Sequence, residues 1–217
     1  MTFDHLPTRR RFLIGAGAIA GGIALGGCSN DSTPPPATPE TTVGPASRLG
    51  EDLRIAALAA SLENLTASAY QTAIDAGPSP RVGGAPDAVM RVLQASKRHH
   101  EEHAASWNSI LTSAGRTRVT DPDQVLKPQI DQAFNQVNSL GTLLRFVLNL
   151  ENIAAATYLS AIGAIENNQV LKTAASIQPV EMQHAAVLQF MVGGYPVPDT
   201  FARTDGARPP SDYPAAE

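Results

Sequence analysis

The sequence predicts an all-α protein, a four-helix bundle built from two similar helical hairpins. The first observation is a repeat, in which residues 62–70 read LENLTASAY and residues 150–158 read LENIAAATY. The second is a weaker match between HEEHAA at residues 100–105 and EMQHAA at residues 181–186. The third is the long connection at residues 116–138, which falls between the two copies. A crossover of this kind joins a second and a third helix that run parallel to each other.

Residues 47–76 are predicted to form the first helix, since Glu63 and Tyr70 recur with small and apolar residues at helical steps. Seven residues make two helical turns, so the two side chains share a face. Gly77 and Pro78 end this helix. The second helix is predicted over residues 86–114, with a proline in its first turn and Gly115 as its C-terminal cap.

A short helix is expected within the connection, over residues 128–137. The third helix is predicted over residues 139–167 and the fourth over residues 169–192. Pro179 lies inside the fourth pattern, so this helix is either kinked there or begins near it. The bundle would span residues 47–193, and the proline-containing tail at residues 194–217 is expected to be irregular.

The N-terminal segment reads as an export signal and lies outside the fold. Arginines 9 to 11 precede a glycine- and alanine-rich apolar stretch that is short and weakly apolar for a membrane-spanning helix. This is the pattern of a twin-arginine signal. The stretch ends in Leu-Gly-Gly-Cys28, which resembles a bacterial lipobox with Cys28 as the lipidated residue. The alternative is an ordinary small residue in a signal tail.

We therefore predict a signal peptide at residues 1–27 and a lipid-bearing, Pro/Thr-rich flexible tether at residues 28–46. The protein would be exported and held on the outer face of the cytoplasmic membrane without spanning it. The chain of 217 residues has a net charge of -4 and no basic run beyond its N-terminus, which argues against nucleic-acid binding. Its single cysteine rules out an internal disulfide.

Acidic and histidine side chains occupy the apolar stripes of all four predicted helices at one level. They are Glu63, His100, His103, Glu151, Glu181 and His184. Burying these groups in an Ala/Leu core is costly unless they are paired. Oxygen and imidazole donors suit iron, manganese or zinc, and a pair of cations would offset three carboxylates. His99, Glu101 and Glu102 are expected on the solvent side, and Trp107 in the core.

This pattern resembles the ferritin-like superfamily, in which two helices each give a Glu and the other two each give Glu-x-x-His. The resemblance covers about residues 48–192 and is closest to exported actinobacterial ferritin-like domain proteins. It implies a metal site for iron, or next manganese, and a reaction with a small oxidant such as O2 or peroxide. Tyr70 and Tyr158 stand two turns after a helix Glu. They would either hydrogen-bond toward the site or fill the core.

One position departs from the family pattern, because His100 stands where the second helix should supply a Glu. In the family that Glu usually bridges two metals, and an imidazole bridges less readily than a carboxylate. The departure favours an asymmetric site, a mononuclear site or a site for another metal over a standard di-iron oxidase. A second reading, from a different functional class, is a metal-free bundle that serves as a scaffold or binding protein of the cell envelope.

Overall fold

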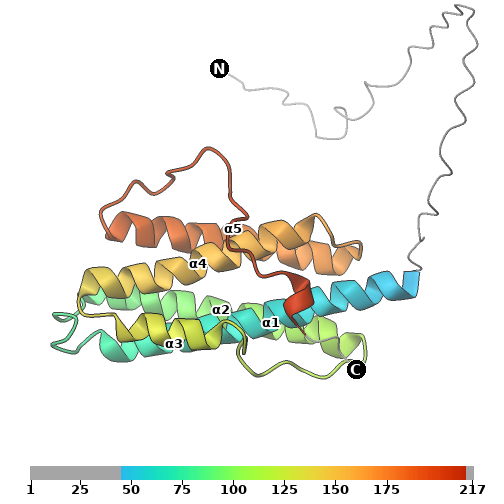
Figure 1. Ribbon diagram of the computed structural model, residues 1–217, viewed down its shortest axis with the longest axis horizontal. Helices are drawn as coiled ribbons and strands as arrows, with labels where there is room; N and C mark the ends of the chain where they lie inside the picture. The colour runs from blue at the N-terminus through green and yellow to red at the C-terminus, as the bar shows by residue number, and fades with distance from the viewer. Residues whose placement is uncertain (1–44, 214–217) are drawn as a thin grey trace, which may run out of the picture. The chain divides into compact units, whose positions relative to one another are not determined.

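The structure is a computed structural model that describes residues 45–213. Within the described range it is all-helical and has no strand, which confirms the predicted fold class (Figure 1). The long helices are α1 (Pro45–Ala76), α2 (Asp87–Ser113), α4 (Leu140–Ile162) and α5 (Asn168–Met191). Two shorter elements are α3 (Lys127–Asn135) and the 3₁₀ turn η2 (Pro210–Asp212).

The helices pair as the repeat predicted, with α1 packed along α2 and α4 packed along α5. Contacts of α1 with α4 and of α2 with α5 close the bundle. The connection after α2 returns along the bundle through α3 before α4 begins, so α2 and α4 run in the same direction (Figure 1). The second hairpin therefore repeats the direction of the first.

Local sequence signals account for most helix ends. Gly115 has a φ of 74°, a left-handed conformation that suits glycine, and the amide of Arg116 donates to the Leu111 carbonyl at 2.8 Å. Ser139 begins α4 through a reciprocal capping box with Thr142. These contacts satisfy backbone groups that a helix end leaves unpaired.

Two predicted helix boundaries were wrong. Helix α4 ends at Ile162 and not at Asn167, because the buried carboxylate of Asp52 accepts hydrogen bonds from the amides of Glu166 and Asn167. Asn167 then caps α5 through its side chain. Helix α5 runs without interruption from Asn168 through Pro179, so the alternative in which it begins near that proline was also wrong.

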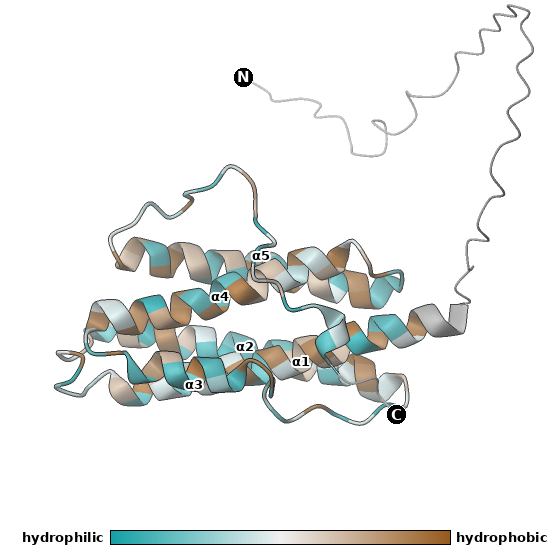
Figure 2. Ribbon diagram, in the orientation of Figure 1, coloured by the Kyte–Doolittle hydropathy of each residue, from teal (hydrophilic) through white to brown (hydrophobic). Residues whose placement is uncertain are grey.

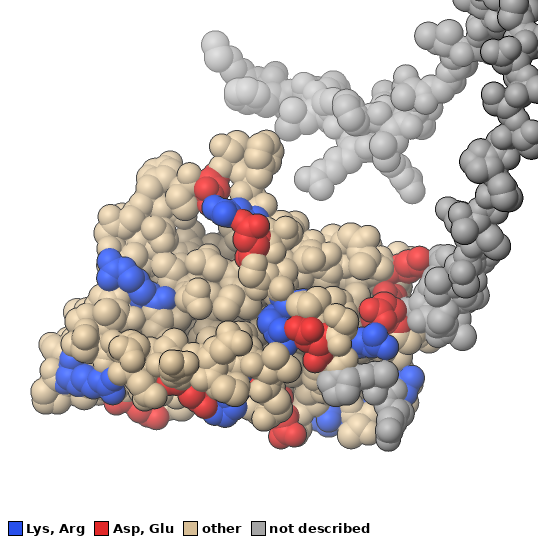
Figure 3. Space-filling view, in the orientation of Figure 1, with Lys and Arg blue, Asp and Glu red and all other residues tan. Residues whose placement is uncertain are grey.

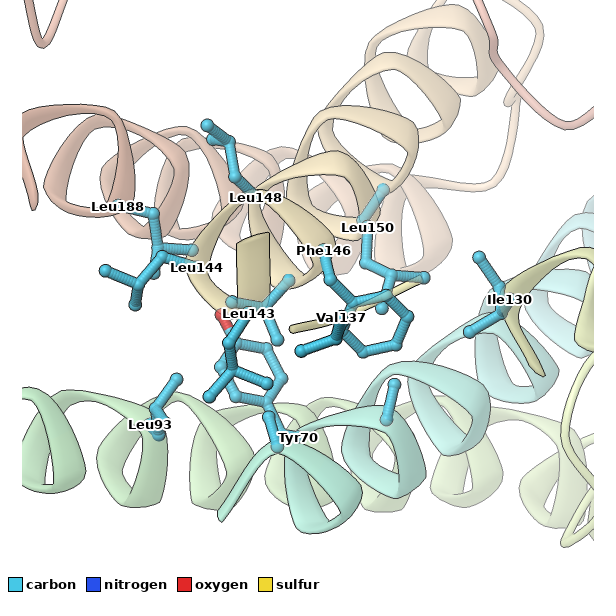
Figure 4. Packing of buried hydrophobic residues seen from close by; sticks show 14 of the residues in the cluster. Tyr70, Leu93, Ile130, Val137, Leu143, Leu144, Phe146, Leu148, Leu150 and Leu188 are labelled. Atoms are coloured by element: carbon cyan, nitrogen blue, oxygen red, sulfur yellow. The ribbon is translucent and has the colours of Figure 1, made fainter. Parts of the chain in front are cut away.

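The bundle core consists of two clusters of buried apolar residues placed one after the other along its length. One cluster contains Tyr70, Leu93, Leu143 and Leu188, and Figure 4 shows Tyr70 projecting from α1 toward α4. The other contains Trp107 and Tyr158. Figure 2 shows hydrophilic and hydrophobic residues mixed along the long helices. The buried polar residues include Glu63, His100, Glu151 and Glu181, one from each long helix.

The segment after α5 has little regular structure in the part that is described, and it returns across α4 to reach α1 (Figure 1). The Arg208 amide donates to the Thr157 hydroxyl at 2.9 Å, and its guanidinium contacts the buried Asp123 at 3.1 Å. On the face shown in Figure 3, charges of both signs are scattered without a continuous patch of one sign. No helix within residues 45–213 has the length and apolarity needed to cross a membrane.

The predicted signal peptide, Cys28 and nearly all of the predicted tether lie outside the described residues. Only residues 45 and 46 of the tether are described, and they belong to α1. The export and anchoring predictions therefore stay predictions.

We predict that Asp52→Ala lowers the free energy of unfolding by about 2 kcal/mol, because two backbone amides of the α4–α5 turn lose their acceptor. Chemical denaturation of the purified protein measures this change. Glu51→Ala is the matched control, since its exposed carboxylate makes an i,i+3 pair with Arg54 among the described residues, and its loss should cost less than about 0.5 kcal/mol. Equal effects of the two substitutions would contradict the assigned role of Asp52.

Candidate metal centre

The structure brings all six predicted donor residues together between the two apolar clusters. Helix α1 gives Glu63, α2 gives His100 and His103, α4 gives Glu151, and α5 gives Glu181 and His184. Five of the six are buried, and the side chain of His103 is 14% exposed. Each long helix carries its donors on the stripe that faces the bundle axis, as expected from their three- and four-residue spacing.

The donors form two overlapping groups, within each of which one ligand atom per residue lies within 4.8 Å of the others. The first group is Glu63, His100, His103 and Glu181. The second group is His100, Glu151, Glu181 and His184. We call them the Glu63 group and the Glu151 group. They share only His100 and Glu181. These two residues stand at the first position of the two segments that match Glu-x-x-His, where the ferritin-like pattern has a glutamate.

His100 lies between the two groups and contacts both. Its Nδ1 is 2.7 Å from Glu63 Oε2, and its Nε2 is 3.2 Å from Glu151 Oε1. Both contacts are hydrogen bonds, and a carboxylate can only accept, so each ring nitrogen carries a hydrogen in this arrangement. The imidazole thus connects the glutamate of the first hairpin with the glutamate of the second.

Two tyrosines hold these same glutamates from the opposite hairpin. The Tyr70 hydroxyl of α1 donates to Glu151 Oε1 on α4, and the Tyr158 hydroxyl of α4 donates to Glu63 Oε1 on α1. Trp107 Nε1 in turn donates to the Tyr158 hydroxyl at 2.7 Å. Both tyrosines are also buried in the core clusters, so each combines the two roles that the sequence left as alternatives.

Several buried donor atoms in the centre have no hydrogen-bond partner among the described residues. They are His103 Nδ1, His184 Nδ1, Glu151 Oε2 and both carboxylate oxygens of Glu181. His103 Nδ1 and Glu181 Oε1 lie only 2.9 Å apart without the alignment of a hydrogen bond. Unpartnered buried polar atoms are costly. Their convergence fits a cation, because oxygen and imidazole donors are those that iron, manganese and zinc accept.

The charges of the centre shift the pKa values of its residues. Burial acts to lower the pKa of His100, but the charges of Glu151 and Glu181 outweigh it and hold that pKa well above the usual value. Burial likewise opposes the contacts of His103 and His184 with the carboxylates, which raise both pKa values to about 9. The pKa of Glu181 is raised by burial and by the charge of Glu63.

Sequence reasoning missed the role of His99. This residue is exposed, as predicted, yet its Nδ1 lies 2.9 Å from His184 Nε2 and the two rings are stacked. His184 therefore has its Nδ1 toward the carboxylates and its Nε2 toward His99. The one feature of the sequence that points to this contact is the adjacent pair of histidines, His99 and His100. Glu101 and Glu102 are exposed, and Glu101 pairs with Lys97 on the same helix.

Two cavities lie beside the centre, and none of its six donor residues lines either of them. A hollow of about 680 Å³ lies between the outer face of α4 and α5 and residues 196–205. A smaller cavity of about 120 Å³ lies under the returning C-terminal segment and reaches Tyr158. The donor residues themselves are buried, apart from the partly exposed His103.

We predict that protein stripped of metal with a chelator loses stability as the pH rises from about 6.5 to 9. The folded pKa values of His103 and His184 lie above the ordinary value of 6.5, so their contribution is fully present below pH 6.5 and disappears as pH passes about 9. Thermal melting across this range measures the loss. In the double variant His103→Gln with His184→Gln, the melting temperature should change less with pH. An equal slope of melting temperature against pH in the parent and the variant would contradict the role given to these two histidines.

Comparison with known proteins agrees with this geometry. A sequence model of the ferritin-like domain family matches residues 51–194, a span that includes all four long helices from the second turn of α1 onward and every donor of the centre. No curated protein and no solved structure matches the chain in the same comparisons. The matched span is more than half of the sequence, and the chain belongs to the ferritin-like domain family.

Proposed function

We propose that this protein is a metalloprotein of the cell envelope that binds iron, or next manganese, among the six donors in its bundle. The observation that carries the proposal is the set of buried imidazole nitrogens and carboxylate oxygens that converge without hydrogen-bond partners. If internal ion pairs alone stabilised the bundle, these atoms should form aligned hydrogen bonds, because a buried ion pair is stable only when its remaining donors and acceptors are satisfied.

Bound iron or manganese would supply electron exchange with a small oxidant such as O2 or peroxide. The protein's own contribution is to position the donors. Tyr70 and Tyr158 each fix the direction of one glutamate from the opposite hairpin, and His99 fixes the ring of His184. His103 is the most exposed of the six donors, so its side of the centre offers the shortest path for a small molecule.

The second candidate is a metal-free scaffold or binding protein of the envelope. One observation favours it, namely that three imidazoles with raised pKa values stand against three carboxylates and can balance their charge. In this reading the centre is a buried ion-pair network, and the stability of the protein does not depend on metal.

We predict that the purified protein contains bound iron or manganese, and that Glu181→Ala with His184→Ala removes it. Glu181 belongs to both donor groups and His184 to one, so the double substitution leaves neither group complete. Plasma mass spectrometry of protein exported by its own host measures the metal. Added metal should stabilise the parent by about 2.7 kcal/mol of unfolding free energy when its concentration is a hundredfold above the dissociation constant. The same variant should lose this stabilisation and the rise in melting temperature that goes with it.

Glu101→Ala with Glu102→Ala is the control, since both residues are exposed on α2 and neither belongs to a donor group. This variant should keep its metal. Metal retained after loss of Glu181 and His184 would refute the proposed site. A parent with no metal and no metal-dependent melting would instead favour the scaffold.

The proposed location follows from residues 1–46 and rests on their sequence. Export through the twin-arginine route and lipidation at Cys28 would place the bundle on the outer face of the cytoplasmic membrane. A bundle with no membrane-spanning helix in its described part would then depend on this anchor for membrane attachment.

We predict that Cys28→Ser releases the protein from the membrane fraction, because the substitution removes the only thiol that can carry the lipid. Fractionation of host cells followed by mass spectrometry of the N-terminal peptide measures both location and lipid. Ser29→Ala should leave the protein in the membrane fraction. Unchanged membrane association of the Cys28 variant would argue against a lipid anchor.

A further inference from the structure

The imidazole of His100 faces the two donor groups with different atoms. Nδ1 is directed at the Glu63 group and Nε2 at the Glu151 group, with distances of 2.7 Å and 3.2 Å to their glutamates. We propose that His100 bridges two metal ions through its two ring nitrogens, where the family pattern would place a bridging carboxylate. This inference rests on the proposed function, since it concerns how the same centre holds its metal.

Glu181 is divided between the two groups in the same way. Its Oε1 lies 2.9 Å from His103 Nδ1 in the Glu63 group, and its Oε2 lies 3.6 Å from His184 Nδ1. His184 Nδ1 is also 3.4 Å from Glu151 Oε1, so it belongs with the Glu151 group. One carboxylate and one imidazole therefore each present one donor atom to either side.

This division gives each metal position four protein donors from three of the four long helices. The first position has Glu63 Oε2, His103 Nδ1, Glu181 Oε1 and His100 Nδ1. The second has Glu151 Oε1, His184 Nδ1, Glu181 Oε2 and His100 Nε2. Each set has two carboxylate oxygens and two imidazole nitrogens, so the shared residues make the two positions chemically equivalent.

The charges of this arrangement balance. Both ring hydrogens of His100 leave to solvent as two metal–nitrogen bonds replace two N–H bonds, and the bridging ring then carries one negative charge. His103 and His184 each release the Nδ1 hydrogen to solvent and bind as neutral rings. Together with the carboxylates of Glu63, Glu151 and Glu181 this makes four negative charges, which two divalent cations neutralise. A net charge of zero is what a site in a buried apolar core requires.

A single metal ion in this centre would give a ligand role to fewer of the unpartnered buried atoms than two ions would. An ion in the Glu63 group would leave His184 Nδ1 buried without a partner. An ion in the Glu151 group would leave His103 Nδ1 in the same state. Two ions give both of these nitrogens a ligand role, which is why the structure favours the bridge over the mononuclear alternative.

The test uses the full-length protein loaded with Mn²⁺, which is visible both by electron paramagnetic resonance and by anomalous X-ray scattering. We expect two Mn²⁺ per chain with a spin-coupled spectrum. An anomalous difference map should show two peaks, one at each edge of the His100 ring. Because a bridge across the ring separates the metals, the peaks should lie farther apart than the roughly 3.5–4 Å of ordinary two-metal sites.

Two substitutions at His100 test its bridging role independently of the other ligands. His100→Gln cannot bond a metal on both edges of a ring, and it should lower the content from two Mn²⁺ to one and abolish the spin coupling. His100→Glu restores the carboxylate of the family pattern, and it should keep two Mn²⁺ at a shorter separation. Circular dichroism of each variant shows whether the bundle is intact. If a variant does not fold, the anomalous map of the parent still tests the bridge.

The outcomes distinguish the bridge from the proposed function. One Mn²⁺ in the parent, lost on Glu181→Ala with His184→Ala, would overturn the bridge and leave the metal site standing. Two Mn²⁺ with an unchanged spectrum in His100→Gln would also overturn it. No Mn²⁺ bound by the parent would overturn the bridge, and a parent that binds neither Mn²⁺ nor iron would overturn the proposed function itself.

Discussion

The burial of three carboxylates at one level of an apolar helical bundle is the constraint on which the rest of the structure depends. Glu63, Glu151 and Glu181 lie between two apolar clusters, where water does not reach them. Charges in such a place are strongly unfavourable unless other charges and donors surround them. Three histidines and two tyrosines supply that environment, and every one of them comes from the inward stripe of a long helix.

The same groups also join the two hairpins. Tyr70 and Tyr158 reach from one hairpin to the glutamate of the other, and His100 connects the two glutamates directly. Contacts between α1 and α4 and between α2 and α5 also join the two hairpins. The centre is therefore both the proposed site of chemistry and the polar link through which two repeated halves assemble in one register.

The two halves are similar in sequence, yet their surroundings differ. Trp107 donates to the tyrosine of the second half, and His99 contacts His184, whereas His103 is partly exposed. These differences leave His103 more exposed than the other donors and give His184 a supporting contact. Two donor groups of the same composition therefore lie in unequal surroundings.

The sequence alone determined the fold class, the hairpin repeat and the crossover, because helical spacing is a local property. It also identified six candidate donor residues that the structure brings together. It also placed Gly115 at a helix end, since the left-handed conformation there favours glycine. It misplaced the end of α4, because the acceptor that stops this helix is Asp52, more than a hundred residues away in the chain.

Only the tertiary structure decided which atoms of the donors meet. The sequence identified His100 as a departure from the family pattern, but it could not show that the two ring nitrogens face different glutamates. Nor could it show that each tyrosine serves the opposite hairpin, or that His99 turns back to His184. Periodicity fixes the face of a helix on which a side chain lies, whereas its partner depends on how four helices pack together.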